Sequence, residues 1–288
     1  MTGIDNFKRA EVLTQALPYI QKYYNKIVVI KYGGNAMVNE ELKRQVMDDI
    51  ILLGLIGVKV VLVHGGGPEI TEVLEKFGKK SVFVDGLRVT DRETAEIVKM
   101  VLAGKVNKNI VNLIQTKGGN AIGICGIDGR LIEARRRDEV HGFVGEITRV
   151  NVKPIMDLLQ NGYIPVVSTV GCDKEGNIYN INADTAAAYI AGAMCAERLM
   201  TLTDIAGVLR DVNDPSSLIH FMNVDEARAM IKSGAVSGGM IPKIQCCIDA
   251  IELGVRRVTI IDGRVPHSLL IEMLTDEGAG TMIAAADE

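Results

Sequence analysis

The sequence lacks the features that mark membrane, secreted and nucleic-acid-binding proteins. No apolar run reaches the roughly 18 residues that a membrane span needs. The first residues carry neither the basic stretch nor the apolar core of a secretory signal. Basic residues do not outnumber acidic ones: 32 Lys and Arg face 36 Asp and Glu, for a net charge of −4. We therefore expect a cytoplasmic protein that binds neither a membrane nor nucleic acid.

Metal-binding patterns of cysteine and histidine are also missing. The five cysteines are an odd number, lie in or beside apolar segments and form no CxxC pair, and no HxxxH pattern occurs. Buried thiols in a reducing cytoplasm fit this usage better than disulfides or a zinc centre. We predict no metal site built from protein side chains.

Strand-like and helix-like segments alternate along the 288 residues. The predicted strands cover residues 26–32, 58–64, 121–126, 164–168, 198–202 and 257–261. The predicted helices cover residues 40–55, 68–77, 90–116, 152–160, 185–196, 224–233 and 242–253. Because the strands are apolar throughout, both of their faces should be buried. The pattern predicts an α/β fold, a three-layer α/β/α sandwich around a mostly parallel central sheet.

Three segments depart from this alternation. Residues 130–150 are polar and irregular, which predicts a surface hairpin or flap, and residues 210–217 predict a loop. Residues 7–24 carry apolar side chains at helical spacing before the first strand, and Pro18 should kink this extra N-terminal helix. Its apolar stripe either covers the sheet edge or packs on another copy of the chain. Because an exposed apolar stripe needs a partner, the oligomer is favoured.

Two strands end in the same way, with one cation-capable residue followed by glycines. Successive glycine N–H groups can converge on one anion, and a following helix adds its positive end. Parallel strands present their C-terminal ends at one edge of a sheet. The two turns therefore predict an anionic ligand held from two sides. They consist of Lys31 with Gly33 and Gly34, and of His64 with Gly65, Gly66 and Gly67.

Three charged side chains could act on such a ligand. A lone lysine at a strand end usually reaches solvent, but the glycines after Lys31 favour ligand contact. Lys243 follows a glycine pair and Pro242, which we place at the first position of a helix; there the lysine opposes the helix dipole unless a phosphate lies nearby. Asp184 precedes an alanine-rich helix. A helix N-cap is its simplest role, and holding both lysines in their charged state is the functional one.

The remaining polar residues of these turns are less specific. Arg88 is a solvated surface charge unless it borders the anion pocket, where its fork could take a carboxylate. His64 has no serine, cysteine or metal-ligand partner at an informative spacing, so we assign it a structural role. The GxxxxGK[ST] motif is absent, and the turn after His64 lacks the last glycine of GxGxxG. Protein-kinase signatures are missing too.

Five motifs nevertheless occur in an order typical of one family. They are residues 31–35, 64–68, 86–90, 180–184 and 238–243. Together they span essentially the whole chain, which resembles the amino-acid kinase family and, within it, the acetylglutamate kinases. The resemblance implies the amino-acid kinase fold. It also implies phosphoryl transfer from ATP, bound with Mg²⁺, to the side-chain carboxylate of N-acetyl-L-glutamate, giving N-acetylglutamyl 5-phosphate in arginine biosynthesis.

The resemblance also implies roles for single residues. Lys31 and Lys243 would stabilise the phosphoryl group during transfer, and Asp184 would organise both lysines. Residues 1–196, the N-terminal helix and substrate lobe, would share one sheet with a nucleotide-binding lobe of residues 197–288, because no linker separates them. Phosphoryl and substrate oxygens would be bound by N–H groups of Gly33, Gly34, Gly65, Gly66 and Gly67. The amino-acid part would be bound by Arg88, Asn180 and Asn182, and the nucleotide by Thr203, Asp204 and Gly207.

Some members of this family are inhibited by arginine and resemble this chain at both ends. They have an extra N-terminal helix and a C-terminal segment like residues 267–281. Those members look like homohexamers joined through the N-terminal helices. By resemblance, Glu272 would meet the guanidinium of L-arginine, and Gly278 and Gly280 would contact it through the main chain. A core helix over residues 269–274 is the simpler interpretation. Some relatives also bind a PII signalling protein, and nothing in the sequence decides this for the present chain.

Three alternative functions fit the sequence less well. Another carboxylate or carbamate kinase of the same family is disfavoured by residues 86–90 and 180–184. A sensor without turnover is disfavoured because Lys31, Asp184 and Lys243 are all present. A nicotinamide-dependent oxidoreductase would need a glycine fingerprint that the chain lacks.

Overall fold

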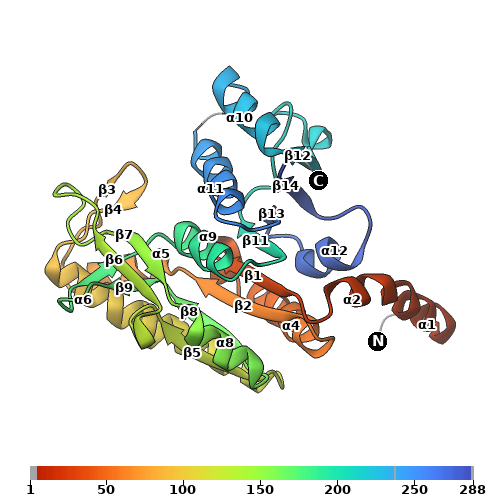
Figure 1. Ribbon diagram of the computed structural model, residues 1–288, viewed down its shortest axis with the longest axis horizontal. Coiled ribbons are helices and arrows are strands. Elements are labelled where there is room, and N and C mark those ends of the chain that lie inside the picture. The colour runs from red at the N-terminus through yellow and green to blue at the C-terminus, as the bar shows by residue number, and fades with distance from the viewer. Residues whose placement is uncertain (1–4, 237, 287–288) are drawn as a thin grey trace.

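An eight-stranded sheet runs through the computed structural model, which describes residues 5–236 and 238–286 (Figure 1). Its strand order is β12-β14-β13-β11-β1-β2-β8-β5. The six predicted strands pair in parallel, as their uninterrupted apolar runs lead us to expect. They are β1 (Ile27–Tyr32), β2 (Lys59–His64), β5 (Ala121–Cys125), β8 (Ile164–Ser168), β11 (Arg198–Thr203) and β13 (Arg257–Asp262). Two further strands were not predicted: β14 (Gly280–Ala284), antiparallel to β13, and β12 (Phe221–Asn223), parallel to β14.

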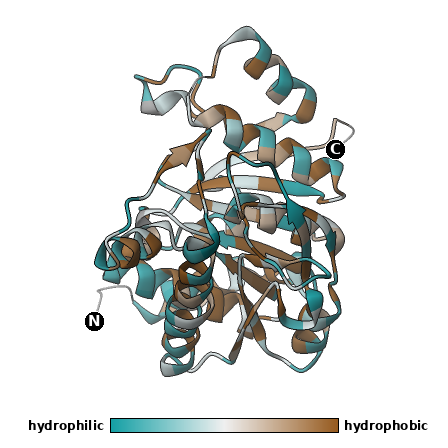
Figure 2. Ribbon diagram, turned by 90° about the vertical axis from the view of Figure 1, so that its left-hand side faces the viewer, coloured by the Kyte–Doolittle hydropathy of each residue, from teal (hydrophilic) through white to brown (hydrophobic). Residues whose placement is uncertain are grey.

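Helices cover both faces of this sheet. On one face Val29 and Val61 join the core under α8 (Lys153–Gln160), α9 (Ala183–Ala193), α10 (Val224–Ser233) and α11 (Met240–Glu252). On the other face Val28 and Leu62 join the core under α4 (Glu40–Leu55), α5 (Gly67–Lys76), α7 (Asn107–Thr116) and α12 (Ser268–Leu274). Neighbouring residues of one strand thus enter opposite cores, which confirms the three-layer sandwich. Figure 2 shows hydrophobic residues gathered on the strands between the helices.

The long helical stretch predicted for residues 90–116 is present and has an internal irregularity. It begins as α6 (Arg92–Lys99), continues through the π-helical segment η1 (Met100–Val106) and ends as α7. Leu102 and Val106 of the π-helical segment are buried and join the same core as α4 and α5. A π-helical stretch often marks a functional site, and this one packs against the second glycine turn.

Residues 130–150 form the predicted hairpin, but the expectation of irregular structure is wrong. Strands β6 (Ile132–Arg136) and β7 (Gly145–Val150) pair antiparallel and extend a second sheet with β9 (Val170–Cys172) and β10 (Ile178–Asn180). One face of this hairpin buries Ile132 and Ile147 in the core beneath α9. A smaller hairpin consists of β3 (Phe83–Val84) and β4 (Leu87–Arg88). Residues 210–217 are a loop, as predicted, with one short 3-10 turn, η3 (Pro215–Ser217).

The N-terminal segment is kinked as predicted. It forms α1 (Asn6–Gln15) and α2 (Leu17–Tyr23), with Pro18 in the first turn of α2. The Tyr19 hydroxyl donates to Asp276 Oδ1 at 2.5 Å, next to α12. In contrast, α1 buries no residue, and Phe7 is 77% exposed. Its apolar stripe is therefore uncovered in the isolated chain. Within the described ranges, no helix combines the length and apolarity that crossing a membrane requires.

Candidate active site

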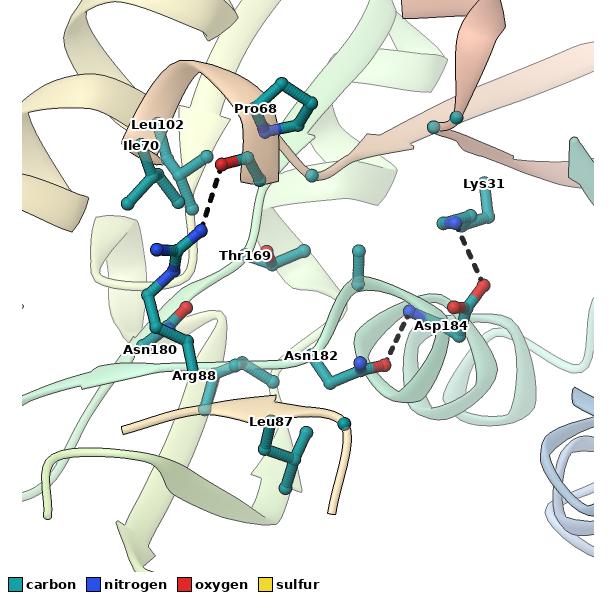
Figure 3. Close-up of a pocket in the computed structure, with 18 of the residues that line it drawn as sticks. Lys31, Pro68, Ile70, Leu87, Arg88, Leu102, Thr169, Asn180, Asn182 and Asp184 are labelled. Carbon is teal, nitrogen blue, oxygen red and sulfur yellow. Dashed lines mark hydrogen bonds and ion pairs between the residues drawn. The ribbon is translucent and has the colours of Figure 1, made fainter. Parts of the chain in front are cut away.

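A cavity of about 240 Å³ lies at the C-terminal ends of β1 and β2, where the two glycine turns meet (Figure 3). This is the edge at which parallel sheets bind ligands. Of the residues singled out from the sequence, ten line the cavity. They are Lys31, Gly33, Gly34, Gly65, Gly66, Gly67, Arg88, Asn180, Asn182 and Asp184.

Lys31 and Asp184 form an ion pair in this cavity. The Lys31 Nζ lies 3.1 Å from Asp184 Oδ1, and the lysine side chain is only 11% exposed. The N-cap interpretation of Asp184 is wrong. The cap of α9 is Asn182, whose Oδ1 accepts the N–H groups of Asp184 and Thr185. Because Asn182 caps the helix, the Asp184 carboxylate can turn to the lysine, as Figure 3 shows.

Lys243 lies on the other side of Asp184. It and Asp184 both line a small adjoining cavity, together with Thr203 and Cys246. Burial is the main cause that raises the pKa of the Cys246 thiol to about 12; Asp184 raises this pKa further, while Lys31 and Lys243 lower it. Asp184 is therefore the carboxylate that both lysines border, Lys31 through the ion pair and Lys243 through the shared small cavity. The prediction that Pro242 opens the helix is wrong, because α11 begins at Met240 and Pro242 is its third residue.

Each turn contains a glycine that lies where a side chain would collide. Gly34 has a φ of +68°, and an added Cβ would lie 2.5 Å from Asp204 Oδ1. A Cβ on Gly66 would lie 2.7 Å from Leu102 Cδ2 of the π-helical segment. The first turn therefore packs against the end of β11, and the second packs against η1. Only glycine allows these approaches.

Arg88 is anchored at the start of α5. Its Nη2 donates to Gly67 O and to Thr71 Oγ1, both at 2.9 Å, and its Nη1 donates to Ser81 Oγ. The guanidinium also lies 4.7 Å from the centroid of the Phe83 ring. Burial lowers the pKa of Arg88, although an arginine stays charged. The surface-charge interpretation of Arg88 is therefore wrong.

A larger cavity of about 480 Å³ opens beside Asp204 and Gly207. Its other walls are mostly apolar, including Val208, Val236 and Met240, and Arg264 stands at its edge. The Arg264 guanidinium is held by Asp262 through two hydrogen bonds of 2.8 and 2.9 Å. Arg264 is not among the residues singled out from the sequence, although it lies two residues after the apolar strand β13. Thr203 borders the small cavity instead, and its hydroxyl donates to Ile205 O at 3.2 Å.

Glu272 lies in α12, away from these three cavities. Its Oε1 accepts from Arg198 Nη2 at 2.9 Å, and its Oε2 accepts from the Ala279 N–H at 2.8 Å. Gly278 lies beside this carboxylate: an added Cβ would lie 2.8 Å from Glu272 Oε2. Gly280 is required by strand pairing, because its Cβ would lie 1.9 Å from Ile260 O. Arg198, the partner of Glu272, is not among the residues singled out from the sequence.

No group of three or more His, Cys, Asp and Glu side chains among the described residues is arranged to hold a metal ion. The central cavity is lined by the cations Lys31 and Arg88, by glycines of both turns and by the Asp184 carboxylate.

Comparison with known proteins gives consistent matches. A sequence model of the amino acid kinase family matches residues 26–262. The chain is 55% identical to acetylglutamate kinase of Brachyspira hyodysenteriae, over 98% of this chain and 99% of the relative. It is 52% identical to acetylglutamate kinase of Clostridium beijerinckii, over 97% of this chain and 99% of the relative. The corresponding protein of Nostoc sp. is 54% identical, over 96% of this chain and 93% of the relative.

Solved structures show the same fold. N-acetylglutamate synthase from Neisseria gonorrhoeae, complexed with coenzyme A and N-acetyl-glutamate, superposes with a TM-score of 0.84 at 25% identity. The match covers 97% of this chain and 64% of that chain. Carbamate kinase from Giardia lamblia bound to AMP-PNP superposes with a TM-score of 0.65 at 17% identity, over 91% of this chain and 99% of that chain. At that identity only the fold is shared.

Proposed function

The chain belongs to the amino acid kinase family, and from that premise we propose that its cleft transfers a phosphoryl group from ATP to the side-chain carboxylate of N-acetyl-L-glutamate. The product is N-acetylglutamyl 5-phosphate, an intermediate of arginine biosynthesis. One observation carries the proposal. The ion pair of the buried Lys31 with Asp184 lies beside two glycine turns in a chain that is 55% identical, over nearly its full length, to acetylglutamate kinase.

The chemistry fits the side chains present. A glutamyl carboxylate is already ionised at pH 7, so its attack needs no general base. The site must instead bring two anions together and align them, because phosphoryl transfer depends mainly on positioning and charge neutralisation. Lys31 and Lys243 supply positive charge from two sides, and Asp184 reduces the repulsion between them. The N–H groups of Gly33, Gly34 and residues 65–67 bind the phosphoryl and carboxylate oxygens.

Arg88, Asn180 and Asn182 hold the amino-acid part of the substrate. Three hydrogen bonds to protein acceptors fix the Arg88 guanidinium, which leaves two of its five N–H groups for a carboxylate. The Asn180 amide donates to Thr90 Oγ1 at 3.3 Å, which orients its oxygen. This substrate lobe comprises residues 1–196.

The nucleotide binds in the lobe of residues 197–288. The mostly apolar cavity bordered by Asp204 and Gly207 suits an adenine ring, and Thr203 supports the turn before it. Mg²⁺ enters with the phosphates of ATP, because it is usually held by one or two carboxylates and substrate oxygens. Asp204, which approaches the Gly34 turn, would supply such a carboxylate when the nucleotide binds with its Mg²⁺.

Regulation by L-arginine forms the next part of the proposal. The effector binds beside α12, with its guanidinium at Glu272 and its remaining groups on the main chain of Gly278 and Gly280. Arg198 already occupies one oxygen of that carboxylate, so the effector shares or displaces this contact. Loss of activity on titration with millimolar arginine supports the proposal, and unchanged activity refutes it.

The exposed apolar stripe of α1 suits an interface between copies. We assign it to a homohexamer in the cytoplasm, joined through the N-terminal helices. Phe7 and Leu13, which are 77% and 73% exposed, would be covered in that assembly. Light scattering after size exclusion tests it: deleting residues 1–16 should reduce the particle to a dimer. A hexamer that survives this deletion contradicts the assignment.

ADP release with four acceptors tests the reaction itself. N-acetylglutamate, glutamate, aspartate and carbamate are each supplied with ATP and Mg²⁺, with and without hydroxylamine. We expect ADP release with N-acetylglutamate alone, and a hydroxamate when hydroxylamine traps the acyl phosphate. ADP release that depends on carbamate or aspartate instead would assign another kinase activity. No release with any acceptor would indicate a sensor.

A further inference from the structure

His64 has no part in the chemistry proposed above, yet it is fully buried at the end of β2, directly before the second glycine turn. Both nitrogens of its ring are engaged. The Nδ1 lies 2.8 Å from Gly65 O, and the Nε2 lies 3.1 Å from Asn107 Nδ2. The histidine therefore bridges the glycine turn and the first residue of α7.

These contacts define one tautomer. Asn107 Nδ2 also lies 2.9 Å from Val166 O, and a carbonyl oxygen can only accept, so this atom is the amide nitrogen. It donates to His64 Nε2, which must then lack a proton. The proton of the neutral ring is on Nδ1, which donates to Gly65 O. Burial lowers the pKa of His64 to about 4, so the ring is neutral near pH 7.

The hydrogen bond at Gly65 determines the direction of the next amide. In a planar trans peptide the carbonyl and the following N–H point in opposite directions. With Gly65 O turned to the histidine, the Gly66 N–H points away from it. Within residues 5–236 and 238–286, no protein group accepts the N–H of Gly66 or of Gly67. Both glycines line the central cavity.

The residues around the Asn107 side-chain amide leave space for it. Asn107 is 0% exposed and starts α7 immediately after the π-helical segment. A Cβ on Gly123 would lie 1.9 Å from Asn107 Oδ1, so the neighbouring strand β5 has no side chain there. The π-helical segment also confines the turn, because Leu102 and Val106 pack against Gly66.

We propose that His64, held by Asn107, is a positioning residue that fixes the Gly65 carbonyl and thereby aims the Gly66 N–H at the oxygens of the reacting carboxylate and phosphoryl group. The inference rests on the proposed function, since it names what orients the donors of that site. His64 itself does not touch the substrate. Its effect should therefore fall on kcat, because an N–H aimed at the developing charge acts in the transition state.

Two substitutions distinguish the effect of the hydrogen bond to Gly65 O from the effect of side-chain volume at position 64. In His64→Asn the amide nitrogen takes the place of Nδ1 and can still donate to Gly65 O. In His64→Gln the amide lies near the former Nε2 and that donor is lost. We expect His64→Gln to lower kcat about 100-fold with less than a threefold change in KM for ATP, and His64→Asn to restore kcat to within about tenfold of wild type. His220→Gln, an exposed histidine outside the cleft, controls for the substitution itself.

The readouts distinguish failure of this inference from failure of the proposed function. If the wild type is active and both variants lose kcat equally, the proposed role of His64 is refuted. It is also refuted if the wild type is active and His64→Gln keeps the wild-type kcat. An inactive wild type overturns the proposed function instead. The tautomer is then tested without turnover, by ¹⁵N NMR of the imidazole between pH 6 and 8. We expect the proton on Nδ1, and a proton on Nε2 overturns the inference whatever the activity.

Discussion

Arg198 and Glu272 form an ion pair that is almost completely withdrawn from water, with side chains 2% and 3% exposed and a 2.9 Å contact. The perturbation is to replace them singly and together, as Arg198→Met, Glu272→Leu and the double variant. Removing one partner of such a pair leaves a buried charge and destabilises a protein by about 3–5 kcal/mol. Replacing both with apolar residues of similar volume removes that penalty.

The two single variants should differ in size of effect. In Arg198→Met the lone Glu272 keeps the hydrogen bond from the Ala279 N–H, which limits the loss to about 3 kcal/mol. In Glu272→Leu the guanidinium of Arg198 cannot lose its proton. It keeps a hydrogen bond to the main-chain oxygen of residue 272 at 3.3 Å and a contact with the Tyr23 ring at 5.7 Å, but it has no anionic partner there. We therefore expect a loss of about 5 kcal/mol.

Calorimetric unfolding without ligands measures these effects. In a chain of this size 1 kcal/mol shifts Tm by roughly 2 °C, so the single variants should melt about 6 °C and about 10 °C below wild type. The double variant should melt within about 2 °C of wild type. Single variants as stable as wild type, or a double variant that loses the sum of both effects, would refute the argument, because neighbours in one ion pair must couple.

Two further predictions concern the cleft, and a third concerns Asp49, a buried carboxylate of α4 that lies 2.6 Å from His267 Nδ1. Lys31→Ala and Lys243→Ala should each lower kcat at least about 100-fold with little change in KM; near-normal turnover in steady-state assays would remove their assigned role. Gly34→Ala should lower stability by about 1–3 kcal/mol in denaturant unfolding, because φ is +68° and the Cβ would lie 2.5 Å from a carboxylate; equal stability contradicts this. Burial raises the pKa of Asp49 to about 6, so the stabilisation that its protonated form provides below pH 4 is lost as the pH rises through 6. The free energy of unfolding of Asp49→Asn, relative to that of wild type, should therefore rise by about 2–3 kcal/mol between pH 4 and pH 7. A difference that does not change with pH would exclude burial of the carboxylate as the cause.

The parts of the fold that the sequence predicts are those with a strong local signal. Six strands that are apolar on both faces could only be buried between two layers of helices, and they are. Strand β12 has three residues and no such run, and β14 begins with glycine and threonine. Strand β14 pairs with β13, and β12 pairs with β14, so each needs a partner from another part of the chain. Short strands of this kind are defined by their neighbours more than by their own residues.

Site residues, like strands, could be predicted only where the sequence carries a local signal. The glycine turns at the ends of β1 and β2 predicted that Lys31 would contact a ligand, and Lys31 lines the cleft. Asp184 lines it too, although a helix N-cap was its simplest interpretation. The roles of Asn182 and Arg88 could not be read locally. A residue two positions before Asp184 takes the cap, and Thr71 and Ser81 hold the arginine from a helix and a loop. Contacts between elements that are far apart in sequence leave no periodic pattern.

The central claim is that two lysines distant in sequence act on one phosphoryl group. A crystal structure with ADP, Mg²⁺, aluminium fluoride and N-acetylglutamate tests this most directly. We expect the Nζ atoms of Lys31 and Lys243 both within hydrogen-bonding distance of the fluoride ligands, with Asp184 between them. A structure in which Lys243 faces solvent while the aluminium fluoride is bound at the glycine turns would contradict the claim.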